Sequence, residues 1–144
     1  MKEVDLGALK IIENLRGAGY IGFLAGGCVR DGLLGLKPKD WDIATNASPE
    51  QVASIFEQTL LVGEKFGSCV VVLSEDSYDV TTFRNDGPYL DKRHPAYIEI
   101  SSPKQDALRR DFTINGLFYD PIKLELIDYV GGLRDLEERK LRCI

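Results

Sequence analysis

The stretch LAGGCVRDGLLGLKPKDWDIAT, residues 24–45, constrains the fold of this 144-residue chain more than any other part of its sequence. It begins with a short apolar run that ends in a glycine pair, Gly26 and Gly27, as is typical where a buried strand turns into a helix. It closes on Asp40 and Asp42, two carboxylates that lie two positions apart before an apolar flank. The pattern predicts a strand, a tight turn, a helix and a second strand.

Asp40 and Asp42 are candidate ligands for a metal ion. Residues i and i+2 of a strand point to one face, so the two carboxylates are expected to converge while Trp41 points to the other side. Adjacent carboxylates repel unless a cation lies between them, and Mg²⁺ prefers oxygen ligands. A solvated strand end is the alternative, and the apolar Ile43–Ala44 flank favours the metal site.

The glycine pair and Arg30 predict a phosphate site beside these carboxylates. Glycines between a strand and a helix let backbone amides approach phosphate oxygens closely, and an arginine one turn into the helix could hold phosphate bidentately. The alternatives are an ordinary tight turn and a surface arginine paired with Asp31. Gly26 and Gly27 are therefore candidates for contact with a nucleotide.

Asp79 is the candidate for a third carboxylate, which would complete a two-metal site for in-line displacement. It lies at the start of a predicted strand, YDVTTFR (78–84), where an unpaired acidic residue would be costly if buried. A strand-edge position near the preceding turn is an equally good interpretation.

The segment LRRDFTIN (108–115) interleaves polar and apolar side chains. At helical spacing, Asp111 and Asn115 would share one face, and Arg110 would lie beside them. Such a group could contact phosphate and sugar hydroxyls. A surface helix with an arginine–aspartate pair is the alternative.

The hydrophobic pattern predicts a mixed, mostly antiparallel sheet flanked by helices, an α/β (α+β) fold, in one domain over residues 1–144. Helices are expected at 4–17, 27–34, 49–56, 103–108, 111–118 and 133–139. Strands are expected at 20–25, 41–44, 60–62, 67–73, 78–84, 97–100 and 124–128, with a turn at 75–77 and a mobile polar loop at 85–95.

The bulk composition limits the possible functions. The formal net charge is −5, whereas a domain that grips nucleic acid through phosphates alone is more often basic. Three separated cysteines form no metal-ligand pattern, which favours reduced thiols in the cytoplasm, and the longest apolar run is too short to span a membrane. The basic trio 92–94 could touch nucleic acid, but its histidine, His94, fits a solvated loop better than a general base.

Five motifs together, in this order, resemble the catalytic head of the class II tRNA nucleotidyltransferases (CCA-adding enzymes) and the bacterial poly(A) polymerases. These enzymes belong to the DNA polymerase beta-like nucleotidyltransferase superfamily. The motifs are GGCVRD (26–31), DWDIAT (40–45), DVTTFR (79–84), RRDFTIN (109–115) and IDYVGGLRDLEERKLR (127–142). They span nearly the whole chain after the first predicted helix.

The resemblance implies chemistry for the acidic residues. Asp40 and Asp42 would bind Mg²⁺ and activate the terminal hydroxyl of a primer RNA for attack on the α-phosphate of CTP or ATP. Asp79 falls at a carboxylate position of the same site. Residues 85–97 fall where the family has a flexible loop that affects nucleotide choice.

The resemblance also implies the nucleotide contacts. Gly27 and Arg30 would contact the phosphates of the incoming nucleotide. Arg110 and Asp111 would lie beside the nucleotide and its ribose, with Asn115 in support.

One element of the family pattern is not found in the sequence. The family selects its base with an acidic-x-x-Arg element in a neck that follows the head, and Glu138–Arg139 does not replace it because it lies within the last head motif. We therefore expect a head domain with neck, body and tail absent. Three hypotheses remain: a CCA-adding head that acts on the 3′ end of tRNA, a poly(A) polymerase head, and a nucleotide-binding module or scaffold for a partner chain that lacks selective catalysis.

Overall fold

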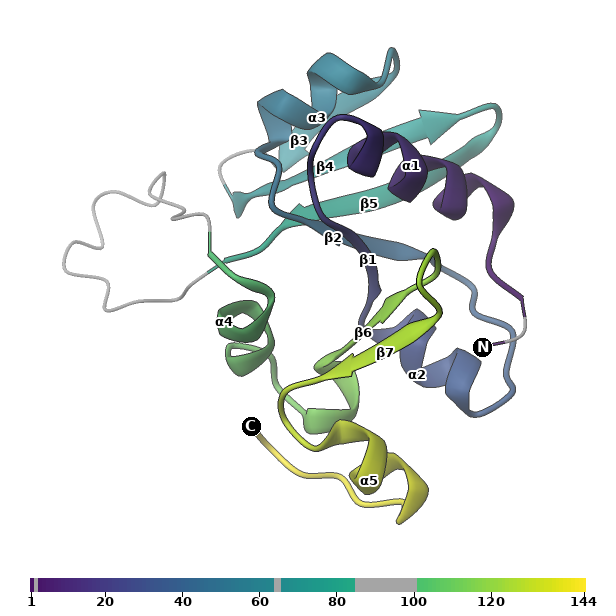
Figure 1. The fold of residues 1–144 in the computed structure, drawn as a ribbon, viewed down its shortest axis with the longest axis vertical. Helices are drawn as coiled ribbons and strands as arrows, with labels where there is room; N and C mark the ends of the chain where they lie inside the picture. The colour runs from purple at the N-terminus through teal and green to yellow at the C-terminus, as the bar shows by residue number, and fades with distance from the viewer. Residues whose placement is uncertain (2, 64–65, 85–100) are drawn as a thin grey trace, which may run out of the picture.

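A seven-stranded sheet forms the centre of the molecule in the computed structural model, which describes residues 1, 3–63, 66–84 and 101–144 (Figure 1). The strands are β1 (Gly22–Ala25), β2 (Asp42–Thr45), β3 (Thr59–Gly63), β4 (Ser68–Leu73), β5 (Asp76–Thr82), β6 (Leu117–Asp120) and β7 (Glu125–Asp128). Their order is β3-β4-β5-β2-β1-β6-β7, and within this described sheet β2 and β5 are the parallel pair while the other neighbours are antiparallel. The predicted fold class is confirmed.

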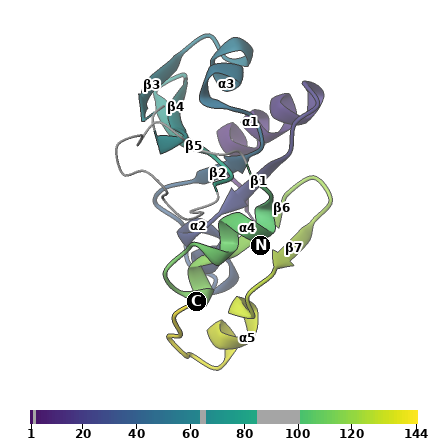
Figure 2. The ribbon, with the colours of Figure 1, turned by 90° about the vertical axis from the view of Figure 1, so that its left-hand side faces the viewer.

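Five α-helices surround the sheet in the described ranges. They are α1 (Leu6–Gly17), α2 (Gly27–Leu33), α3 (Pro49–Ile55), α4 (Pro103–Leu108) and α5 (Gly132–Glu137). Figure 2 shows α3 and α5 at opposite ends of the molecule. None of these helices is long and apolar enough to cross a membrane.

Two helices begin with the same local chemistry. The Ser48 hydroxyl accepts a hydrogen bond from the backbone N–H of Gln51 at 3.2 Å. In turn, Oε1 of Gln51 accepts one from the backbone N–H of Ser48 at 2.9 Å. The Ser102 hydroxyl accepts from the backbone N–H of Gln105 at 3.2 Å in the same way. Because a proline with preset φ follows each serine, both starts are well defined, as the sequence predicted for α3 and α4.

The two sides of the sheet differ in what they bury. The side that carries Leu24, Ile43 and Val80, called the aliphatic face below, packs against α1 and α3. The opposite side carries Ala25, Ala44 and three phenylalanines and is called the aromatic face below. Strand alternation places consecutive residues such as Asp42 and Ile43 on opposite faces.

The predicted helix over residues 111–118 is wrong. A short 3₁₀ turn, Thr113–Asn115, is followed by β6, all four residues of which are buried between β1 and β7. The apolar run Leu117–Tyr119 fits a helix and a buried strand equally well by pattern, and its pairing with β1 and β7 decides for the strand.

One smaller correction concerns a turn. The hairpin between β4 and β5 turns at Ser74–Glu75, because Leu73 pairs with Asp76 in the ladder, so the turn is shorter than the predicted 75–77. Ser74 has a positive φ of 56°, as the tight turn requires. The predicted loop at 85–95 and strand at 97–100 lie outside the described residues.

Candidate functional site

One row of side chains crosses four strands of the aromatic face. Ala25 pairs with Phe118 on one side and with Asp42 on the other. In the parallel pair of β2 and β5, Ile43 lies opposite Val80, so Asp42 and Asp79 lie side by side one position earlier. The predicted approach of these two carboxylates therefore follows from the register of the sheet.

Asp40 joins this pair from a different backbone setting than predicted. It lies in an exposed bend before β2 begins, not on the strand itself. Partial burial raises the pKa of Asp42, and the charges of Asp79 and Asp40 raise it further, while Arg110 acts in the opposite direction. Two further carboxylates and one guanidinium thus act on Asp42 at the start of β2.

The carboxylates fit a divalent cation that keeps part of its own water shell. Within the described ranges, no group of three or more His, Cys, Asp or Glu side chains forms a metal-binding cluster. Asp40 and Asp42 still repel each other, which raises the pKa of Asp42 and which a cation would relieve. Mg²⁺ is commonly bound by one or two carboxylates together with waters and substrate phosphates.

The glycine pair lies next to two arginines. Gly26 has a positive φ of 73°, and a Cβ placed on it would lie 3.4 Å from Nη1 of Arg110. A Cβ on Gly27 would lie 3.4 Å from Nη2 of Arg30. Both guanidinium groups therefore lie in van der Waals reach of this glycine turn.

Arg30, Asn115 and Asp111 form a hydrogen-bonded chain. Nη1 of Arg30 donates to Oδ1 of Asn115 at 2.7 Å, and Nδ2 of Asn115 donates to Oδ1 of Asp111 at 3.2 Å. The bonds from the Asn115 amide and the Phe112 N–H hold the pKa of Asp111 below its usual value. The predicted contact between Asp111 and Asn115 is therefore present, although their segment is not an α-helix.

Arg30 also pairs with its neighbour in sequence. Its Nε donates to Oδ1 of Asp31 at 3.0 Å, which is the surface pair weighed as the alternative for this arginine. Separate nitrogens of one guanidinium serve Asp31 and Asn115, so the Asp31 pair is present together with a bond to Asn115 that the sequence did not predict.

Asp106 is the residue near the site that sequence reasoning missed. It is 1% exposed and accepts hydrogen bonds from the side chains of Arg109 and Arg110 and from the backbone N–H of Arg84. The guanidinium carbon of Arg110 lies 5.4 Å from the ring centre of Phe118. The i, i+3 and i, i+4 spacing of Asp106 to the two arginines was the signal that could have found it.

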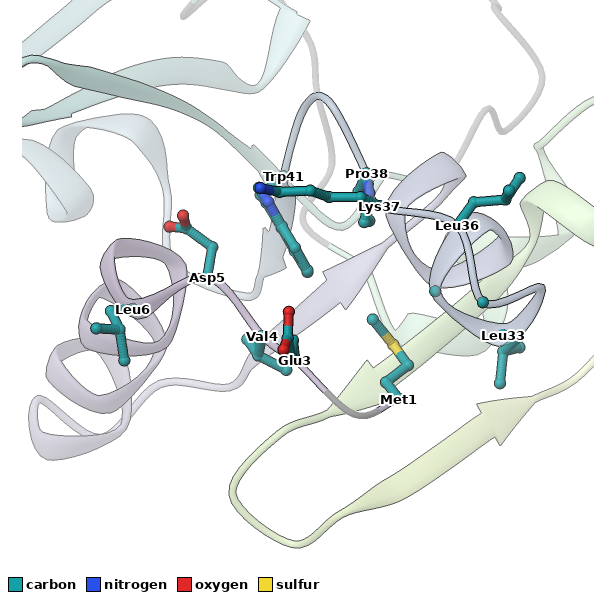
Figure 3. Close-up of a pocket in the computed structure, with 12 residues that line it drawn as sticks. Met1, Glu3, Val4, Asp5, Leu6, Leu33, Leu36, Lys37, Pro38 and Trp41 are labelled. Atoms are coloured by element: carbon teal, nitrogen blue, oxygen red, sulfur yellow. The ribbon is translucent and has the colours of Figure 1, made fainter.

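A cavity of about 1030 Å³ lies away from these residues, on the aliphatic side (Figure 3). Trp41, Leu33 and Met1 line it together with residues at the start of α1 and after α2. None of the predicted site residues belongs to its wall. Trp41 packs against the aliphatic core, so it does point away from the two carboxylates that flank it.

The cysteines and the basic trio are the remaining residues that the sequence singled out. Cys28 and Cys69 are buried free thiols, and burial raises the pKa of Cys28 to about 11, which keeps it protonated and unreactive. Cys143 is an exposed free thiol. His94 and the basic trio 92–94 lie outside the described residues.

Comparison with known proteins gives consistent matches. The family described as "Poly A polymerase head domain" matches residues 22–142. The chain is 43% identical, over its whole length, to 36% of a CCA-adding enzyme of Bacillus pumilus. It is 41% identical, over 99% of its length, to 34% of poly(A) polymerase I of Haemophilus influenzae.

Solved structures agree with the sequence matches. The crystal structure of the Bacillus stearothermophilus CCA-adding enzyme in complex with CTP superposes with a TM-score of 0.84 at 41% identity, over 94% of this chain and 32% of that one. A tRNA nucleotidyltransferase complexed with a primer tRNA and an incoming ATP analog superposes with a TM-score of 0.71 at 28% identity, over 92% of this chain and 38% of that one. This chain thus spans about a third of the length of the relatives that it matches.

Proposed function

This chain belongs to the family of poly(A) polymerase head domains, and on that premise we propose that it is the catalytic head of a nucleotidyltransferase that adds nucleotides from CTP and ATP to the 3′ hydroxyl of tRNA. One observation supports this most directly. Asp42, with Asp40 and Asp79, lies within electrostatic reach of Arg110, which in turn lies beside the Gly26 turn. Paired carboxylates next to a cationic, side-chain-free turn suit a metal-bound triphosphate.

The carboxylates would hold the metal. Asp40 and Asp42 would bind Mg²⁺, and Asp79 would complete the acidic group beside them. Mg²⁺ bound there would neutralise charge on the triphosphate and make the primer hydroxyl easier to deprotonate. The acidic residues would place that hydroxyl opposite the α-phosphate for in-line attack.

The cationic residues would hold the nucleotide. Arg110 and Arg30 approach the backbone at Gly26 and Gly27, so their guanidinium groups would bind phosphate oxygens at that turn. Asp111 lies at the end of the chain of hydrogen bonds from Arg30 through Asn115. Its carboxylate could accept a hydrogen bond from a ribose hydroxyl, with Asn115 keeping it in place.

Nucleotide binding by the 144-residue chain tests the metal site. Isothermal titration calorimetry of CTP with Mg²⁺ should show binding that the double variant Asp40→Ala, Asp42→Ala abolishes. Asp76→Ala in β5 is the matched control, since it removes an exposed carboxylate outside the predicted site residues and should leave the affinity unchanged. Unchanged CTP binding in the double variant would contradict the role given to these carboxylates.

The poly(A) polymerase alternative rests on the similar identity of both kinds of relative, 43% for a CCA-adding enzyme and 41% for a poly(A) polymerase I. A longer form of the chain, given tRNA that lacks its 3′ end together with CTP and ATP, separates the two. Incorporation of both nucleotides on the tRNA supports CCA addition. Incorporation of ATP alone on generic RNA supports the polymerase.

A further inference from the structure

We propose that Asp106 is a positioning residue that fixes the orientation of Arg110 at the nucleotide site. The proposal rests on the function proposed above, because it concerns how an arginine of that site is presented. Asp106 lies on α4, on the aromatic side of the sheet, and belongs to none of the motif residues assigned to metal or nucleotide.

The contacts of Asp106 hold one edge of the Arg110 guanidinium. Oδ2 of Asp106 accepts from Nε at 3.2 Å and from Nη2 at 3.0 Å. Because both bonds end on this oxygen, they hold the Nε–Nη2 edge of the planar guanidinium toward Asp106 and leave Nη1 on the opposite edge. That nitrogen is the one that lies 3.4 Å from the Cβ position of Gly26.

Two further features make this arrangement rigid. The guanidinium carbon of Arg110 lies 5.4 Å from the ring centre of Phe118, which is itself fully buried. The second oxygen of Asp106, Oδ1, accepts from the Arg84 backbone N–H at 3.0 Å and from Arg109 at 3.1 Å, so the carboxylate cannot rotate without losing them. Asp106 thereby ties α4 to the backbone that follows β5.

The orientation of Arg110 affects whether its guanidinium pairs with the carboxylates at the candidate metal site. Arg110 interacts with Asp42 through space, and without another partner its guanidinium would be drawn to the carboxylates at the metal site. An ion pair there would compete with the cation and withdraw the guanidinium from phosphate. Asp106 supplies the alternative partner, so Arg110 stays at the glycine turn and Asp42 stays available.

A double-mutant cycle tests the proposal by calorimetry with CTP and Mg²⁺. Asp106→Asn keeps the shape of the side chain and an acceptor for the Arg84 N–H but loses the charge that holds Arg110. It should weaken CTP binding by about 10- to 100-fold in the unaltered chain. In an Arg110→Ala background the same change should alter affinity by no more than about twofold, whereas in an Arg109→Ala background the full loss should remain.

Equal losses in both arginine backgrounds would overturn the proposal, because a merely structural defect does not depend on Arg110. If Asp106→Asn does not fold, Arg110→Lys gives the same information from the other side, since lysine keeps the charge but cannot make the two-nitrogen contact. A CTP affinity close to that of the unaltered chain in Arg110→Lys would overturn the role of orientation.

The outcomes also distinguish failure of the positioning role of Asp106 from failure of the proposed nucleotidyltransferase function. CTP binding that depends on Asp40 and Asp42 but shows no coupling between Asp106 and Arg110 would overturn the positioning role alone. Absence of CTP binding by the unaltered chain would overturn both.

Discussion

The two faces of the sheet bury different chemistry although they share the same strands. The aliphatic face is filled by branched side chains such as Leu24, Ile43 and Val80, packed against α1 and α3. The aromatic face has alanines at Ala25 and Ala44 in the same strands. The charged groups of the candidate site lie on that side as well, where Asp42 pairs with Ala25 in the ladder.

Two carboxylates of the aromatic face, Asp120 and Asp42, differ in their neighbours and in the direction of their pKa shifts. Asp120, in β6, accepts a hydrogen bond from Arg16 at 2.6 Å and two more from backbone N–H groups. Although burial acts to raise it, the pKa of Asp120 is held below its usual value by these bonds. Asp42 instead has carboxylates as neighbours and a raised pKa. A structural carboxylate is paired, whereas a candidate metal ligand is left with like charges.

The largest effect on stability is expected from the aliphatic face. Ile43→Ala should lower the free energy of unfolding by about 2–5 kcal/mol, because it leaves a cavity beneath two helices. CTP affinity of the folded fraction should remain within about twofold, since the side chain points away from the site. Urea unfolding measures the first quantity and calorimetry the second. A cost well under 1 kcal/mol would mean that this face is not close-packed.

The next effect tests the paired carboxylate. Asp120→Asn should lower the free energy of unfolding by about 2 kcal/mol, because the charged bond to Arg16 is lost while the backbone contacts can persist. Asp76→Asn, at an exposed position of β5, is the matched control and should cost almost nothing. The lowered pKa of Asp120 predicts a contribution that is present above the usual aspartate value and lost as pH falls through the folded-state pKa. An Asp120→Asn cost that stays constant across that range would contradict the pairing.

Many of the candidate site residues were visible in the sequence, whereas the difference between the two faces was not. The paired aspartates, the glycine turn and the arginines were found from residue types and spacing. Each alone also fitted an ordinary turn or a solvated surface, and the five motifs in order favoured a nucleotide site. For Asp79, the sequence favoured a site carboxylate and a strand-edge residue equally. Its position beside Asp42 depends on the parallel pairing of β2 with β5, which no local pattern encodes.

The errors have physical causes as well. The segment 111–118 contains an apolar run that a helix or a central strand could bury, and only neighbours distant in sequence decide between them. Asp106 escaped notice because its partners are ordinary helix-spaced arginines. Its near-complete burial, which makes it the anchor of both, is a property of the tertiary fold.

Asp42, the candidate metal ligand, should show the opposite pH dependence to Asp120. A raised folded-state pKa means that the folded protein holds the Asp42 proton more tightly, so stability falls as pH rises from the usual aspartate value through the folded-state pKa. The difference in thermal midpoint between the unaltered chain and Asp42→Asn should follow this fall, by less than the Asp120 effect because Asp42 is only partly buried. Saturating Mg²⁺ should stabilise the unaltered chain and not the variant. A difference that does not vary with pH would contradict the mutual repulsion of the carboxylates.

The smallest effect gives the sharpest contrast between the faces, because α3 and α4 begin with the same serine–proline cap. Ser48→Ala and Ser102→Ala should each lower the free energy of unfolding by about 1 kcal/mol through loss of one cap bond. Ser48 caps a helix of the aliphatic face, so its loss should leave CTP affinity unchanged. Ser102 caps the helix that carries Asp106, so fraying there should loosen Arg110 and weaken CTP binding measurably. Calorimetry with CTP on the two variants decides the point. Equal CTP affinities would mean that α4 holds Arg110 without its cap. A loss of CTP affinity in Ser48→Ala alone would contradict the placement of the nucleotide site on the aromatic face.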